Sequence, residues 1–421
     1  MKSRTVIILW VVAIVLGIGS YFVKFHGNNE TTSHTTLSPG DKIFSSFPVE
    51  NIATITLTQG EDSTQIVRTS QHEWGVANRE NYPPDYELLK NLLGALHALK
   101  VTQGYPAKEE NFGRFGLLES SETVGEQGLR ITIKAKDGST IADVMFGKYN
   151  GTGQAAGRYM RSYADTSGVY AVGETFPGVA ATPESWLDKD FIKVEQLQSI
   201  AVSAPADPSF AAWKVSRSAV TGPTAQFKLD GMSEKETMKL TSTTELRSLF
   251  GYVAFQDVLD AKTVQETSHP DAKLKRIATL TTMDGLTYTL TYWPQKAKPK
   301  KEGDPEPDPR LPEVKPSYLV TLTTTANIQQ KRTAAAGEKP EISKQLDAQF
   351  AAAKKATEAK LAAAKAFEGR TFKVSHSTIA PLEKKRSDFV KTVRPSVTSP
   401  PVRVPGSQSP PPLAPLPPQG R

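Results

Sequence analysis

The chain of 421 residues contains no cysteine. Disulfide bridges, thiolate metal sites, cysteine nucleophiles and a lipid-modified N-terminal cysteine are therefore all excluded. Histidine is scarce, and none of the six histidines forms an H-x-x-x-H pair or lies near acidic residues at zinc-like spacing. They are His26, His34, His72, His97, His269 and His376. We therefore expect no metal site and no cofactor.

The sequence also lacks a concentrated charge of either sign. The net charge of +7 is modest for this length, and the basic residues do not form a stripe interleaved with aromatic side chains. Nucleic acid is therefore not an expected partner. The hydrophobic content is only 38%, and there are 30 prolines, which indicates that part of the chain lies outside a packed core.

A single long apolar run stands near the start of the chain. Residues 5–23 carry no charge, and about 20 apolar residues in a helix span the hydrocarbon core of a bilayer. Lys2 and Arg4 precede the run, so the positive-inside rule places the N-terminus in the cytoplasm and the body outside the inner membrane, in the periplasm. A cleaved signal peptide is the competing interpretation, but the run is long and no clear A-x-A site follows it. We expect residues 1–24 to form a single-pass transmembrane anchor, and residues 25–47, which are polar and rich in Ser, Thr and Gly, to form a flexible tether.

Two stretches of the remaining sequence repeat one order of elements. In residues 48–190, a period-two strand around Ile55 precedes a Trp-x-Val element at Trp74 and a Leu-rich helix capped by Asp85, with Gly104 placed to end that helix. A hairpin at Asp137-Gly138 and two further strands follow.

The second stretch, residues 191–390, runs in the same order. Its strand is centred on Ile200, and Trp213-Lys214-Val215 stands as the counterpart of the first Trp-x-Val. Ser242 and Glu245 indicate a capping box, and a hairpin follows at Asp284-Gly285. The sequence thus predicts an α+β protein with two tandem β-rich repeats, each an antiparallel sheet plus one helix, behind a single N-terminal transmembrane helix.

Two insertions and a tail complete the organisation. Residues 294–316 are rich in proline and mixed in charge, which predicts a disordered loop. Residues 340–368 are rich in Ala, Lys and Glu and predict a long helix, either exposed and held by intrinsic propensity or a weak coiled-coil arm that meets a partner. Residues 391–421 predict a disordered proline-rich tail.

Several short motifs in this pattern resemble the bacterial domain-of-unknown-function family DUF4340. They are the Val49, Ile52 and Ile55 strand, the Trp74-x-Val76 element, Phe115-Gly116-Leu117, Phe146-Gly147-Lys148, Arg158-Tyr159, Val169-Tyr170-Ala171-Val172 and Trp186 to Asp190. The last motif departs from the family pattern by carrying Leu187 where Arg is usual. The resemblance covers roughly residues 49–390. It implies a membrane-anchored protein of no established activity, accessory to an ABC-type transporter or another envelope complex.

No set of residues forms a recognisable catalytic site. The glycine-rich stretch of residues 147–157 lacks the order of a P-loop and of a dinucleotide loop, so we interpret it as a hairpin loop. Asp188 and Asp190 have the spacing of paired carboxylates, although a structural junction explains them better. No serine has a G-x-S-x-G context, and Trp74, Trp186 and Trp213 are more typical of core positions than of sugar stacking.

These observations leave two functional hypotheses. The first is a non-enzymatic, membrane-anchored extracytoplasmic module that binds a protein partner in the cell envelope. The second is a periplasmic ligand- or glycan-binding or hydrolytic domain with its site between the two repeats. A deep pocket between the repeats would favour the second hypothesis, and a solid apolar junction would remove its main support.

Overall fold

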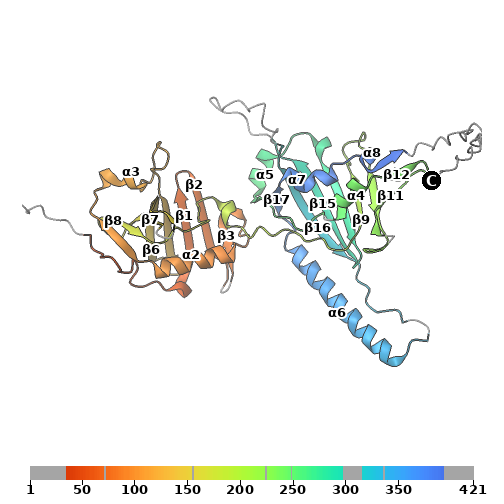
Figure 1. Ribbon diagram of the computed structural model, residues 1–421, viewed down its shortest axis with the longest axis horizontal. Helices are drawn as coiled ribbons and strands as arrows, with labels where there is room; N and C mark the ends of the chain where they lie inside the picture. Colours follow the sequence, from red (N-terminus) through yellow and green to blue (C-terminus); the bar gives the residue numbers. More distant parts are fainter. Residues whose placement is uncertain are drawn as a thin grey trace, which may run out of the picture.

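The computed structural model describes residues 35–70, 73–153, 156–222, 225–247, 249–296, 315–334 and 337–392. The predicted anchor, most of the loop at 294–316 and nearly all of the tail at 391–421 lie outside these residues, as do His26, His34 and His72. Among the described residues, no helix is long and apolar enough to cross a membrane. The described residues form an α+β protein with two antiparallel sheets of eight strands, arranged side by side (Figure 1).

The first unit is built on a sheet in the order β3-β2-β1-β5-β6-β7-β8-β4. Its elements are β1 (Ile52–Gln59), β2 (Asp62–Arg68), β3 (Trp74–Val76), α2 (Tyr86–Ala98), β4 (Val101–Tyr105), α3 (Phe112–Phe115), β5 (Leu129–Ala135), β6 (Thr140–Asn150), β7 (Gly157–Ser162) and β8 (Asp165–Val172). Alternate residues of β1 and β5 are buried, so one face of the sheet meets the core.

The second unit repeats this topology, with the order β11-β10-β9-β14-β15-β16-β17-β13. Its elements are β9 (Leu197–Ser203), β10 (Trp213–Ser216), β11 (Lys228–Leu229), β12 (Glu236–Met238), α4 (Leu240–Arg247), β13 (Asp257–Leu259), α5 (Ala261–Thr267), β14 (Arg276–Thr282), β15 (Leu286–Pro294), β16 (Tyr318–Ala326), α6 (Pro340–Lys365), β17 (Thr371–Val374), α7 (His376–Ile379), α8 (Arg386–Phe389) and β18 (Val390–Thr392). Within each eight-stranded sheet, three strands come first in the chain, a helix and an edge strand follow, and four more strands complete the sheet. The second unit adds a separate two-stranded sheet of β12 and β18. The predicted antiparallel sheets are thus confirmed, but both units contain more helices than the one expected in each.

The topology corrects one correspondence drawn from the sequence. Trp74 lies on β3, the edge strand of the first sheet, whose topological counterpart is β11. Trp213 lies on β10, which pairs directly with β9 and therefore corresponds to β2. The two Trp-x-Val elements are consequently one strand apart in the repeated topology.

The helix α2 largely follows its prediction. The Asp85 side chain accepts a hydrogen bond from the Leu88 main-chain N at 3.0 Å and so caps the helix. Leu92 and Leu96 are buried, whereas Leu88 is only partly buried. The prediction that Gly104 ends this helix is wrong, because α2 stops at Ala98 and Gly104 lies within β4.

Two further expectations are corrected. Ser242 lies inside α4 and donates to the Asp388 carbonyl oxygen at 2.7 Å, so it does not form the N-terminal capping box. Residues 35–47, assigned to the tether, pack against the first unit. Their main chain hydrogen-bonds to β4, as in the contact from Gly40 N to Val101 O of 2.8 Å, and Phe47 is buried.

The helix α6 extends away from the second sheet (Figure 1). It covers 26 residues between Pro340 and Lys365, close to the predicted range. Its C-terminal half packs on β16 and the core, where Thr357 and Ala364 are buried. Its N-terminal half is exposed, including Ile342 and Leu346.

Candidate functional site at the junction of the two units

Aromatic rings fill the junction between the two units. Tyr82, which follows β3, packs edge-on against Phe255 and Phe372 of the second unit, with ring centroids 5.4 and 6.0 Å apart. Phe191 lies in the connecting segment, the stretch of chain between β8 and β9. Its ring centroid is 5.0 Å from that of Phe372, and all four rings are buried. Arg370 lies 5.3 Å from the centre of the Tyr82 ring. The rings join the cores of the two units.

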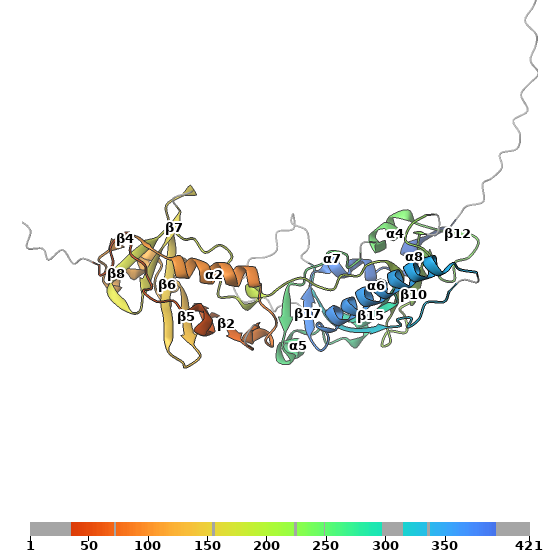
Figure 2. The same ribbon diagram turned by 90° about the horizontal axis from the view of Figure 1, so that it is seen from below.

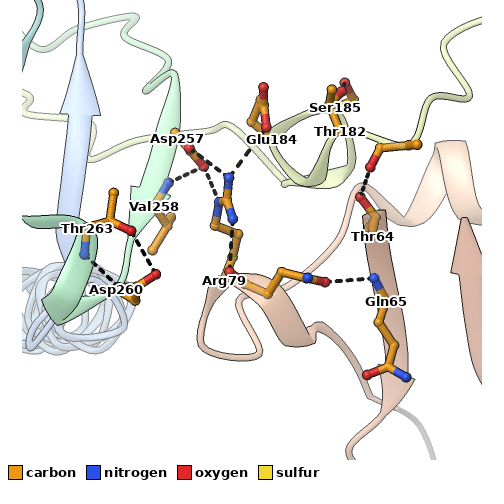
Figure 3. Close-up of polar contacts among 12 residues, drawn as sticks. Thr64, Gln65, Arg79, Thr182, Glu184, Ser185, Asp257, Val258, Asp260 and Thr263 are labelled. Carbon is orange, nitrogen blue, oxygen red and sulfur yellow. Dashed lines mark hydrogen bonds and ion pairs between the residues drawn. The ribbon is translucent and has the colours of Figure 1, made fainter. Parts of the chain in front are cut away.

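An ion pair with two hydrogen bonds also joins the two units at the junction (Figure 3). Arg79 Nε donates to Asp257 Oδ1 at 2.6 Å, and Arg79 Nη2 donates to Asp257 Oδ2 at 3.1 Å. Glu184 accepts a longer contact of 3.5 Å from the same guanidinium. The side chains of Arg79 and Asp257 are only 20% and 14% exposed, so water screens the pair less than it screens a surface pair.

The connecting segment is held by both units. Its Leu187 bridges to Pro84 of the first unit, and its Asp190 bridges to Ala254 of the second. Phe191 N donates to Val253 O at 3.2 Å, and Asp188 N donates to Pro83 O at 3.1 Å. The segment is therefore part of the junction.

The predicted carboxylate pair belongs to this segment. Asp188 and Asp190 are both exposed, and Asp188 Oδ1 accepts a hydrogen bond from Asp190 N at 3.3 Å. Burial, followed by the nearby charge of Asp188, raises the pKa of Tyr82 above its ordinary range. Tyr82 is therefore un-ionised at neutral pH and acts as a packing residue.

Three family motifs of the first unit come together away from the junction: Phe115-Gly116-Leu117, Phe146-Gly147-Lys148 and Arg158-Tyr159. Gly147 of β6 lies against the segment Phe115-Gly116-Leu117, where a Cβ on Gly147 would stand only 2.1 Å from Phe115 O. Arg158 of β7 donates to Gly147 O through Nε at 3.0 Å, and the rings of Phe115 and Tyr159 are 5.0 Å apart. The motif residues thus fix a close contact between a turn and a hairpin.

The glycine-rich stretch lies in this hairpin. Residues 147–150 belong to β6 and Gly157 begins β7, and the two strands pair antiparallel. The described part of the stretch therefore joins two strands and leads into no helix, which confirms its interpretation as a hairpin.

The three tryptophans differ in their surroundings. Trp186 is buried and donates from Nε1 to Ala180 O at 2.7 Å. Trp213 is buried against Phe389, with ring centroids 4.6 Å apart. Trp74 is half-buried beneath the guanidinium of Arg68, beside a shallow apolar hollow of about 440 Å³ next to α2.

The described residues contain no group of three or more His, Asp or Glu side chains arranged to hold a metal ion. His97 is exposed, and burial lowers the pKa of His376.

The junction residues Arg79, Tyr82 and Asp257 carry no local signal in the sequence, since the ion pair joins positions 178 residues apart.

The fold defines a class of protein made of two tandem α+β units with the same eight-stranded antiparallel topology. The chain belongs to the family described as a domain of unknown function (DUF4340), whose model matches residues 74–290, just over half of the chain. The match begins at β3 and ends within β15, so it crosses the junction and is shorter than the resemblance drawn from the motifs. No curated protein and no solved structure matches the chain.

Proposed function

We propose that this protein is a non-enzymatic module of the cell envelope, held in the inner membrane by residues 5–23 and exposed to the periplasm, where it binds a protein partner. The apolar run and the two preceding basic residues support the anchor and its orientation. Residues 25–34 then form the tether, because residues 35–47 pack on the first unit.

The exposed half of α6 is the observation that carries the partner-binding proposal. Ile342 and Leu346 are one helical turn apart, so they lie on one face, and they are 49% and 36% exposed. The other half of the helix is fixed by Lys360, which pairs with Asp284 at 3.1 Å and Glu195 at 3.0 Å. Arg332 also holds the N-terminal half, through Asp347 at 2.8 Å, but leaves the apolar pair exposed. A helix fixed in this way presents an apolar stripe, which suits docking into an apolar groove or against a second helix.

The junction favours a body that presents surfaces over one that encloses a substrate. The aromatic rings and the Arg79–Asp257 pair occupy the place where the alternative hypothesis, a ligand-binding or hydrolytic site between the repeats, requires a hollow. That alternative therefore gains no support from a specific contact, and we do not propose it.

Site-specific photo-crosslinking in cells tests the proposal. A crosslinking amino acid at Ile342 or Leu346 should capture one envelope protein, whereas the same group at Lys134, on β5 of the first unit, should not. The double substitution Ile342→Glu and Leu346→Glu should abolish capture from a third position on the same half, Gln345, without lowering the thermal midpoint. Unchanged capture in the double variant would contradict a role for the stripe.

A separate experiment tests the topology. Protease added to spheroplasts should remove the body, and the protein should remain in the membrane after alkaline carbonate extraction. Protection of the body in intact spheroplasts would invert the proposed orientation. Release by carbonate would exclude the anchor.

A further inference from the structure

A hollow of about 480 Å³ lies at the edge of the second sheet, over β9, β10 and β11. Its lining is polar and carries three cations and no carboxylate. The lining residues are Gln198, Ser199, Lys214, Ser216, Arg217, Ser218, Gln226 and Lys228. A volume of this size is within the range of pockets for small molecules, which is roughly 300–1,000 Å³.

The strand register brings several of these side chains to one face. Ser216 of β10 stands directly opposite Ser199 of β9 on one side and Lys228 of β11 on the other. Directly opposed residues share a face of the sheet, as do Lys214 and Ser216, which are two apart on one strand. The result is a row of two hydroxyls and an ammonium, with a second ammonium beside it.

Arg217 supplies the least expected charge in the hollow. It is only 9% exposed, yet among the described residues its hydrogen-bond acceptors are main-chain carbonyls, Leu197 O at 2.6 Å and Ala225 O at 3.4 Å. No described carboxylate forms an ion pair with it. Arg247 donates to the same Ala225 carbonyl, which adds positive charge. Burial, together with the charge of Arg247, lowers the pKa of Arg217.

A buried guanidinium without an acidic partner is unusual, because buried charges in proteins are normally paired. One carboxylate lies near the rim: Asp230 is 3.7 Å from Lys214 Nζ and accepts from Ser216 Oγ at 3.4 Å. Both side chains of the Lys214–Asp230 pair are about half exposed, and no carboxylate among the described residues forms an ion pair with Arg217 or Lys228.

We propose that this hollow is an anion-binding site for a phosphate monoester on a small polar carrier, such as a sugar phosphate. Guanidinium and ammonium groups with neighbouring hydroxyls recognise the doubly charged phosphate, and the Ser and Gln lining suits a hydroxylated carrier. The site is distinct from the stripe on α6 and does not depend on the membrane topology, so the two proposals succeed or fail separately.

Calorimetric titration of the full chain in non-ionic detergent tests the site. Glucose 6-phosphate and inorganic phosphate should bind saturably, and more weakly as salt is raised, whereas glucose should give no signal. Lys214→Met and Lys228→Met should each weaken binding by about tenfold, in keeping with the loss of a charge-assisted hydrogen bond. Both lysines are exposed, so these variants keep the fold. Lys262→Met is the matched control, because Lys262 is 84% exposed on α5, away from the hollow.

Arg217→Lys keeps the charge but loses the planar fork, and it should weaken binding to a similar extent. Vesicles containing phosphatidic acid form a second arm, which distinguishes a lipid headgroup from a free ester. Binding to the vesicles without binding of glucose 6-phosphate would overturn the proposal that the ligand has a small polar carrier. No saturable signal up to roughly 10 mM glucose 6-phosphate, or equal affinity in the Lys214, Lys228 and Lys262 variants, would overturn the site itself.

Discussion

Arg79 and Asp257 form an ion pair with two hydrogen bonds that joins the two units of the molecule. Arg79 follows the edge strand β3 of the first sheet, and Asp257 begins β13 at the edge of the second. Figure 2 shows the two units end to end along the long axis of the molecule, with this junction between them. The pair therefore adds a polar contact between the two units beside the buried aromatic rings.

Breaking the pair should loosen the junction. Arg79→Met leaves the Asp257 carboxylate partly buried without its main partner, so the free energy of unfolding should fall by about 1–3 kcal/mol.

Because the chain has no cysteine, cysteines introduced at Lys134 and Lys262 can carry spin labels without background. The distance distribution between the labels should broaden in Arg79→Met. In the control Arg332→Met, which removes ion pairs with Glu338 and Asp347 inside the second unit, the distribution should stay narrow. An unchanged distribution in Arg79→Met would show that the rings alone fix the junction.

The ring of Tyr82, as opposed to its hydroxyl, should hold the units together. Tyr82→Ala removes a buried ring in contact with Phe255 and Phe372 and should cost about 3–5 kcal/mol. Tyr82→Phe keeps the ring and should change stability by less than about 0.5 kcal/mol. Chemical denaturation of both variants measures the difference. A large loss of stability in Tyr82→Phe would show that the hydroxyl, and not the ring, makes the main contribution.

The parts of the fold that were predictable from the sequence are those set by local patterns. Alternating residues around Ile55, the Asp137-Gly138 turn and the cap at Asp85 each act within a few residues, and the structure contains all three. The strand β2 was missed because its sequence, DSTQIVR, has only two strongly apolar residues, Ile66 and Val67, and these are adjacent and so give no alternating pattern. Its burial comes from neighbours on both sides.

Long-range contacts explain the wrong predictions. Gly104 resembles a helix terminator in the sequence, but in the structure it allows residue 35 to approach β4: a Cβ at Gly104 would stand 2.0 Å from Thr35 Oγ1. Ser242 has the spacing of a cap, yet its partner is the carbonyl of Asp388, 146 residues away. The hollow around Arg217 could not be predicted from the sequence for the same reason, because its side chains are brought together by the pairing of three strands.

The ion pair between Glu236 of β12 and Arg386 of α8 should contribute stability that is lost in acid. Arg386 donates hydrogen bonds to both carboxylate oxygens of Glu236 and lowers the pKa of Glu236 to about 2. Because the folded pKa is depressed, the contribution is present above the unfolded pKa and disappears as pH falls toward 2. In Arg386→Gln the pKa of Glu236 should rise toward the ordinary value of about 4.3, as read from the carboxyl carbon shift in an NMR titration. A pKa that stays near 2 would assign the shift to the Ser233 main-chain N, which also donates to Glu236.

Glu383 should show the opposite dependence on pH. Its Oε1 is buried without a hydrogen-bond partner among the described residues, and burial raises the pKa of this carboxyl, while Arg276 and Tyr292 oppose the rise. The Tyr292 hydroxyl donates instead to Leu382 O at 3.1 Å. A raised folded pKa means that the stability contribution is complete below the unfolded pKa and is lost as pH rises through the folded pKa. Glu383→Gln stays neutral, so its thermal midpoint should exceed that of the wild type at pH 8, and the two should converge near pH 4. Glu266→Gln on α5, whose side chain is exposed, should follow the wild type at both pH values. A variant less stable than the wild type at pH 8 would mean that the ionised carboxylate of Glu383 is stabilised by Arg276.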